Sequence, residues 1–148
     1  MKSIIKKIAV LFEEATGLPL IYQSEEMVNV KLDSTPLPCG WWYCLTDGQI
    51  VAEGASGKIC ERVQCRIYIG DLNEYDYNGL EAEEIISDCK NRLFNFIAEL
   101  RKNQELTLNS VNTSRRFYLE KDVIVSGYMV DITITEINGF CQCNCKCN

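Results

Sequence analysis

The sequence predicts an α+β fold: a mainly antiparallel sheet with two amphipathic helices packed on one face and a long β-hairpin. Two segments, residues 3–16 and 80–102, carry apolar residues at helical spacing. Several other segments alternate apolar and polar residues, which is typical of half-buried strands. Because the helices and strands are segregated rather than regularly alternating, a parallel α/β architecture is disfavoured.

Length and composition indicate a single globular domain. The chain has 148 residues, of which 47% are apolar and 24% charged, both ordinary values for a globular protein. No apolar run approaches the roughly 18 residues of a membrane-spanning helix, and the amino-terminal residues lack a signal-peptide pattern. We therefore expect one domain over residues 1–140, a flexible Cys-rich tail over 141–148, and no membrane association.

The amino-terminal third predicts one helix and two strands. The helix over 3–16 is expected to end at Gly17, a left-handed cap, and Pro19 prevents its resumption. Residues 20–22 form a short apolar strand. A second, half-buried strand is predicted where alternate residues are apolar, at Val28, Val30 and Leu32.

The middle of the chain predicts a hairpin and one long strand. Two prolines make residues 33–38 an irregular connection. The aromatic segment 41–45 is strand-like, and the turn signal Asp47-Gly48 suggests that residues 49–53 return as its hairpin partner. The clearest strand covers 58–69 and is long enough for an extended hairpin with its tip at 54–57. Its two faces carry Ile59, Val63, Cys65, Ile67 and Ile69 against Lys58, Arg62, Gln64, Arg66 and Tyr68.

The last third predicts a surface loop over 71–78, the second helix and a set of closing strands. Acidic residues crowd the first turns of the helix over 80–102, where they suit its dipole. Two short strands are expected at 106–111 and 115–119, followed by a strong one at 122–137. Gly127 inside that strand suggests a bulge or bend.

Charge and residue usage exclude several functions. Fifteen basic against 21 acidic residues give a net charge of −6, so binding of nucleic acid through its phosphates is disfavoured. The sequence contains no histidine, which removes the usual proton shuttle, any His-assisted nucleophile and every His-ligated metal site. We expect neither enzymatic activity nor a cofactor.

Nine cysteines are present, and we interpret them first as free thiols. Five of them, Cys39, Cys44, Cys60, Cys65 and Cys89, are expected to be inert. The other four are closely spaced at the carboxyl end: Cys141, Cys143, Cys145 and Cys147. Successive thiols on one face of an extended chain lie about 6.5–7 Å apart, too far to close a tetrahedral zinc site alone. A flexible tail, a metal or disulfide clamp between subunits, and covalent modification all remain open.

The order of elements resembles the small tail-terminator or neck-ring (head–tail joining) proteins of tailed bacteriophages. The similarity rests on the amphipathic first helix, the segment 41–48 (WWYCLTDG), the long second helix and the segment 127–139 (GYMVDITITEING). The resemblance implies a structural virion protein that assembles in the host cytoplasm into a sixfold or twelvefold homo-oligomeric ring. Such a ring lies between the portal or connector and the tail, and DNA passes through it without specific binding.

A closed ring needs two unlike surfaces on each subunit, and a DNA conduit benefits from an acidic wall. Candidate subunit contacts are Trp41, Trp42, Tyr43, Arg62, Arg66 and Tyr68. Candidate channel-facing acidic residues are Asp71, Glu74, Glu81, Glu83 and Glu84. Two other functions stay open: a small acidic binding or inhibitory module that mimics nucleic acid, and a metal-binding protein that uses the Cys-rich tail.

Overall fold

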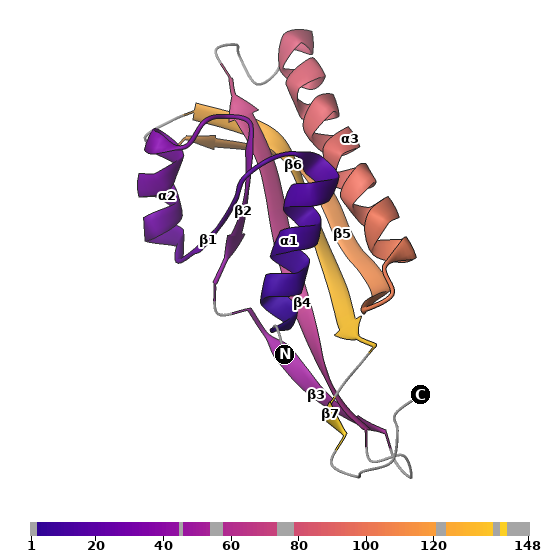
Figure 1. Cartoon of the computed structure of the whole chain (residues 1–148). Coiled ribbons are helices and arrows are strands. Elements are labelled where there is room, and N and C mark those ends of the chain that lie inside the picture. The colour runs from indigo at the N-terminus through magenta and orange to yellow at the C-terminus, as the bar shows by residue number, and fades with distance from the viewer. Residues whose placement is uncertain are drawn as a thin grey trace.

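Helices α1 (Ile4–Thr16) and α3 (Leu80–Lys102) lie on one face of a twisted sheet, as Figure 1 shows. A third helix, α2 (Glu25–Ser34), lies at one edge of the sheet. The computed structural model describes residues 3–44, 46–53, 58–73, 79–120, 124–137 and 140–141. The α+β prediction is confirmed.

Within the described residues the sheet is mixed and mostly antiparallel, and it has seven strands. Five of them form the path β1-β2-β4-β6-β5, in which β1 and β2 are parallel and the remaining neighbours antiparallel. Both β3 and β7 pair with β4. The strand bounds are β1 (Leu20–Gln23), β2 (Cys39–Tyr43), β3 (Gly48–Glu53), β4 (Lys58–Leu72), β5 (Leu106–Glu120), β6 (Ile124–Glu136) and β7 (Phe140–Cys141).

The main core lies between the sheet and the pair α1 and α3. The Ser3 hydroxyl accepts a hydrogen bond from the Lys6 amide at the start of α1, and Gly17 ends the helix with φ 68°. The two helices meet through the rings of Phe12 and Phe96, whose centroids are 5.4 Å apart. Beneath them lie the alternate apolar residues of β4 and β6: Val63, Cys65, Ile67, Ile69, Val130, Ile132 and Ile134. The predicted helical stripes and strand faces are thus confirmed, except at Ile59, which is 39% exposed.

The predicted strand over residues 28–32 is wrong, because these residues lie in α2. The hydroxyl of Ser24 accepts a hydrogen bond from the Met27 amide at 3.4 Å and caps the helix, whose first turn is acidic. Val28 and Leu32, one turn apart, are both buried, while Val30 between them is 58% exposed. The alternation of apolar residues at 28, 30 and 32 suggested a strand. Only Val28 and Leu32 are buried, and they form an i, i+4 pair on one side of a helix.

Helix α2 packs on the sheet face opposite α1 and α3, at the edge formed by β1 and β2. Its buried side chains pack with Trp41, whereas Trp42 belongs to the core under α1 and α3. Because successive strand residues point to opposite faces, the two tryptophans mark the two faces of β2. The expectation that the two predicted helices share one face is confirmed for α1 and α3, and the helix that was not predicted, α2, packs on the other face.

The predicted pairing of residues 49–53 with the 41–45 strand is also wrong. Strand β3 pairs residues 48–53 with residues 58–63 of β4, while β2 pairs residues 39–42 with residues 67–70 of the same strand. Since β6 runs along the other edge of β4, β2 and β3 lie end to end on one edge. The long hairpin expected on β4 is thus made with β3, although its predicted tip, residues 54–57, lies outside the described residues.

Strands β5 and β6 form a second long hairpin. The two short strands predicted at 106–111 and 115–119 are one continuous strand, whose register with β6 shifts between Leu108 and Ser110 and again between Val111 and Thr113. The irregularities thus lie in β5. Gly127 pairs in regular register with Gly70, so the bulge or bend expected there is absent from the described strand. Of the predicted loop 71–78, Asp71 and Leu72 belong to β4.

Candidate functional site

The sheet face not covered by α1 and α3 carries a connected set of polar side chains. At its centre the Asp131 carboxylate of β6 accepts hydrogen bonds from Arg66 Nη2 at 3.0 Å and from Gln64 Nε2 at 3.1 Å, both of β4. The Asp131 side chain is 7% exposed and that of Arg66 is 52% exposed. The hydrogen bond from Arg66 to Asp131 raises the pKa of the guanidinium.

This polar set extends across β4, β6 and β5. Arg62 Nε donates to Thr135 Oγ1 at 3.0 Å, and the Thr135 hydroxyl donates to Asn109 Oδ1 at 2.6 Å. One step along the strands, Asn112 Nδ2 donates to Thr133 Oγ1 at 3.2 Å. Asn109 and Asn112 are the extra residues at the two register shifts of β5, so the bulges place their amides over β6.

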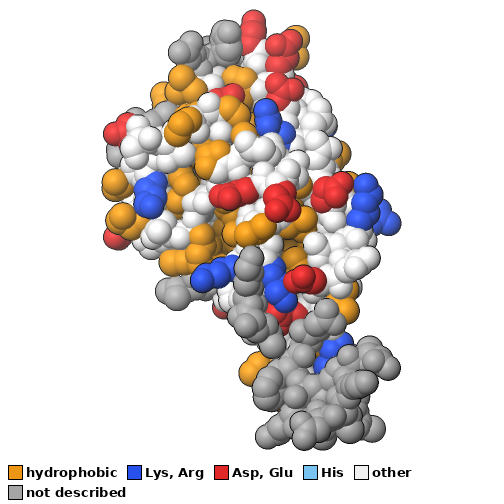
Figure 2. Space-filling model, viewed as in Figure 1, with side chains coloured by type: hydrophobic (Ala, Val, Ile, Leu, Met, Phe, Trp, Pro, Cys, Tyr) orange, Lys and Arg blue, Asp and Glu red, His pale blue; other side chains and the backbone are white. Residues whose placement is uncertain are grey.

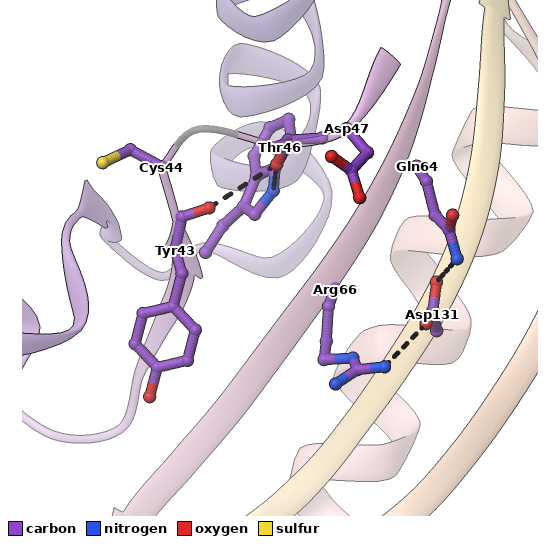
Figure 3. Close-up of a pocket in the computed structure, with 8 residues that line it drawn as sticks. Tyr43, Cys44, Thr46, Asp47, Gln64, Arg66 and Asp131 are labelled. Carbon is purple, nitrogen blue, oxygen red and sulfur yellow. Dashed lines mark hydrogen bonds and ion pairs between the residues drawn. The ribbon is translucent and has the colours of Figure 1, made fainter. Parts of the chain in front are cut away.

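A hollow opens where the chain passes from β2 to β3. Its volume is about 390 Å³, and its floor is formed by Gln64, Arg66 and Asp131. Tyr43, Cys44, Thr46 and Asp47 line the other side, as Figure 3 shows. Trp42 Nε1 donates to Thr46 Oγ1 at 2.6 Å and holds this wall in place. A second hollow of about 280 Å³, which shares Asp47 and Gln64 and adds Arg62 and Thr133, continues it along β4. We call the two together the polar groove.

The polar groove is equipped for recognition of a polar surface. Its guanidinium, amide and hydroxyl groups offer donors and acceptors on a rigid sheet, and Arg62 and Arg66 suit carboxylates. The Asp131 carboxylate is already bound by two donors.

The predicted contact residues fall in two environments. Trp41 and Trp42 are 0% and 1% exposed, so both indoles are interior side chains of this subunit. Trp41 stacks on Tyr68 with ring centroids 5.4 Å apart and an interplanar angle of 3°, and Phe117 packs edge-on against both. Burial raises the pKa of the Tyr43 phenol. Of the predicted contact residues, Tyr43 and Arg66 therefore line the same hollow, and Arg62 lies further along the polar groove. Tyr68 packs against Tyr43 beside the groove.

Of the predicted channel-facing residues, three lie in the first turns of α3 and one at the end of β4. Glu81 and Glu84 are exposed, and the acidic side chains here gather at the top of Figure 2. The Glu83 carboxylate is bound by Arg116 of β5, with Nη2–Oε1 2.6 Å and Nε–Oε2 3.1 Å, which lowers the Glu83 pKa. Asp71 Oδ1 accepts a hydrogen bond from the Leu72 amide at 2.8 Å. Glu74 lies outside the described residues.

The cysteines of the domain are free thiols where described. Burial raises the pKa of Cys39 and of Cys89 to about 12 each, and it also raises that of Cys65. In the described part of the chain no three potential metal ligands cluster. Cys141 belongs to β7, while Cys143, Cys145 and Cys147 lie outside the described residues.

Sequence reasoning missed several residues that shape these surfaces. Arg116, Asn109 and Phe117 all come from β5, and their partners lie on elements distant in sequence. No spacing pattern links such pairs. The β5 bulges also lack a glycine or proline signal, because the residues at the shifts are Asn109 and Asn112.

No protein-family model matches this chain, and no curated protein matches its sequence. None of the described helices is both long and apolar enough to cross a membrane.

Proposed function

We propose that this chain is a structural subunit of a ring in the neck or tail of a tailed bacteriophage. In this role copies of the chain join side by side between the portal or connector and the tail. DNA passes through the opening without being bound in a sequence-specific way. The chain works as a building block of the virion, and its role requires neither catalysis nor a cofactor.

The observation that carries the proposal is the difference between the two edges of the sheet. One edge is β1 with α2 beside it, and the other is the long strand β5 beside α3 (Figure 1). Two unlike surfaces on opposite sides of one subunit are what a head-to-tail ring requires. The resemblance of the sequence to neck-ring proteins points in the same direction.

The charge distribution supports a conduit role. The net charge is −6 per chain, and Glu81 and Glu84 are exposed at the start of α3. Repeated around a ring, such carboxylates repel the DNA phosphates and keep the genome from adhering. The polar groove on the open sheet face is the proposed seat of a neighbouring virion protein.

The test is the protein composition and electron microscopy of purified particles of the virus that encodes this chain. We expect the chain in the particles at a sixfold or twelvefold copy number, with antibody label at the head–tail junction. Its absence from washed particles, or a copy number of one to three, would overturn the proposal. A nucleic-acid mimic would instead be found outside the particles, bound to a basic partner.

A further inference from the structure

An apolar groove lies between α3 and the edge strand β5. It has a volume of about 300 Å³, the space of about ten water molecules. Phe94 and Val111 on its walls are 53% and 48% exposed. Its other lining residues include Ile97, Ala98, Tyr128 and Val130. We call this feature the α3–β5 groove.

The charged residues at this groove are basic. Arg101 lines it and is exposed. Lys90 Nζ lies 5.9 Å from the centre of the Phe94 ring. Lys90, Phe94, Ala98 and Arg101 follow one another at helical spacing, so they form one row along α3. Glu83 also approaches β5, but Arg116 neutralises it.

The outer edge of β5 is poorly suited to receive another strand. In the described part of the chain β5 pairs with β6 alone. Its two register shifts interrupt the regular spacing of backbone groups that a further strand would need. A partner at this edge therefore docks through side chains placed in the α3–β5 groove.

The opposite side of the molecule carries a ridge that complements this groove. The outward side of α2 exposes Met27 by 44% and Val30 by 58%. Glu26, Lys31 and Asp33 beside them are also exposed, so the ridge carries two carboxylates and one ammonium group. Since the inward side of α2 is anchored by its buried residues, the outward side is presented rigidly. We call it the α2 ridge.

We propose that the α2 ridge of one copy docks into the α3–β5 groove of the next copy. This inference rests on the proposed function and specifies its subunit contact. Apolar side chains meet in the centre, and the acidic residues of the ridge face the basic residues of the groove. Because α2 and β5 lie at opposite edges of the sheet (Figure 1), the contact is head-to-tail and can close a ring.

The first test is site-specific photo-crosslinking of the assembled full-length protein, taken from concentrated solution or from virus particles. Phe94 is replaced by benzoylphenylalanine, which suits a half-exposed aromatic position. We expect crosslinks to a peptide containing residues 25–34 of another copy. The matched control places the same group at Leu80, which is 85% exposed outside the groove, and should give no such crosslink.

The second test is a charge exchange, read by sedimentation and native mass spectrometry. Arg101→Glu and Asp33→Lys should each raise the dissociation constant between copies at least about tenfold, because like charges then meet. The double variant should recover most of the affinity. Lys6→Glu and Glu14→Lys, both at exposed positions of α1, are the matched controls and should change it less than about twofold.

The outcomes separate this contact from the proposed function. Rings in which Phe94 crosslinks to other segments, or in which the double variant fails to recover, overturn the docking of α2 and leave the ring standing. A chain that forms no ring in solution and is missing from virus particles overturns both. Crosslinks to residues 25–34 together with charge recovery support both.

Discussion

Gly127 of β6 lies directly opposite Gly70 of β4, and the two backbones approach too closely for a side chain. A Cβ built at Gly127 meets the carbonyl oxygen of Ile69 and lies 2.8 Å from Gly70 Cα. We therefore expect Gly127→Ala to force the strands apart and to destabilise the domain by about 1–3 kcal/mol or more. Urea unfolding followed by circular dichroism measures this.

The matched control is Gly48→Ala at the start of β3. There the nearest atom to an added Cβ is Arg62 O at 3.2 Å, and the next lies at 3.7 Å. A clearly smaller loss is expected. Equal losses at the two positions would show that β4 and β6 are not in contact at Gly127.

The helical character of α2 predicts opposite effects at two nearby valines. Val28 is 1% exposed and Val30 is 58% exposed. Val28→Asp buries an unpaired carboxylate and should cost about 3 kcal/mol or more, whereas Val30→Asp should cost less than about 1 kcal/mol. Thermal unfolding of the two variants compares them. Similar losses at both would favour a strand, in which the two side chains share a face.

The Asp131 carboxylate holds the polar groove together, because it accepts hydrogen bonds from Arg66 and Gln64. Asp131→Asn replaces one acceptor oxygen by a donor in a nearly buried position. We expect a loss of about 1–3 kcal/mol in unfolding free energy. Asp47→Asn on the groove wall is the control and should stay within about 0.5 kcal/mol. Unfolding in guanidinium chloride distinguishes the two.

The ion pair between Glu83 and Arg116 predicts a pH effect with a definite sign. The hydrogen bond from Arg116 lowers the Glu83 pKa from its ordinary value, so the pair contributes to stability above that ordinary pKa and loses its contribution as the pH falls through the lowered pKa. Arg116→Gln should move the Glu83 pKa upward, as measured by NMR titration of the side-chain carbon. An unmoved value would refute the pairing.

The thiols of the domain should differ in reactivity. With the pKa of Cys39 and Cys89 raised to about 12, these thiols carry almost no thiolate at pH 8. Cys44 is partly exposed. Iodoacetamide at pH 8 should therefore label Cys44 at least about tenfold faster than either buried thiol, as read by mass spectrometry of the peptides. Rates that stay unequal after unfolding in urea would show that local sequence, rather than burial, sets the difference.

The long elements could be predicted because their signals are local. The apolar stripes of α1 and α3 repeat over several turns, and apolar and polar residues alternate over residues 62–69 of β4 and 130–135 of β6. Helix α2 could not be separated from a strand, because three alternating residues fit both periods. In the structure this segment is a helix, whose amino-terminal end is stabilised by the hydrogen bond from the Met27 amide to the Ser24 hydroxyl and by the acidic first turn.

The sequence predicted where the strands lie along the chain better than it predicted which strands pair. The turn at Asp47-Gly48 suggested a hairpin between its flanking strands, yet β2 and β3 each pair with the long strand β4. The candidate site was predicted in part: parity placed Arg62 and Arg66 on the open face. Their partner Asp131 shares that face by parity, whereas Asn109 is brought there by a bulge in β5.

Because β2 and β3 follow one another along a single edge of β4, the two halves of β4 have different partner strands on that edge. Its upper half lies under α1 and α3, while its lower half continues with β3 and β7 into an arm beyond the helices (Figure 1). Ile50, 81% exposed on that arm, shows how little it adds to the interior. The arm can thus lengthen by about 6.6 Å when two residues are added to each of its strands. The packing of the helices on the sheet does not have to change.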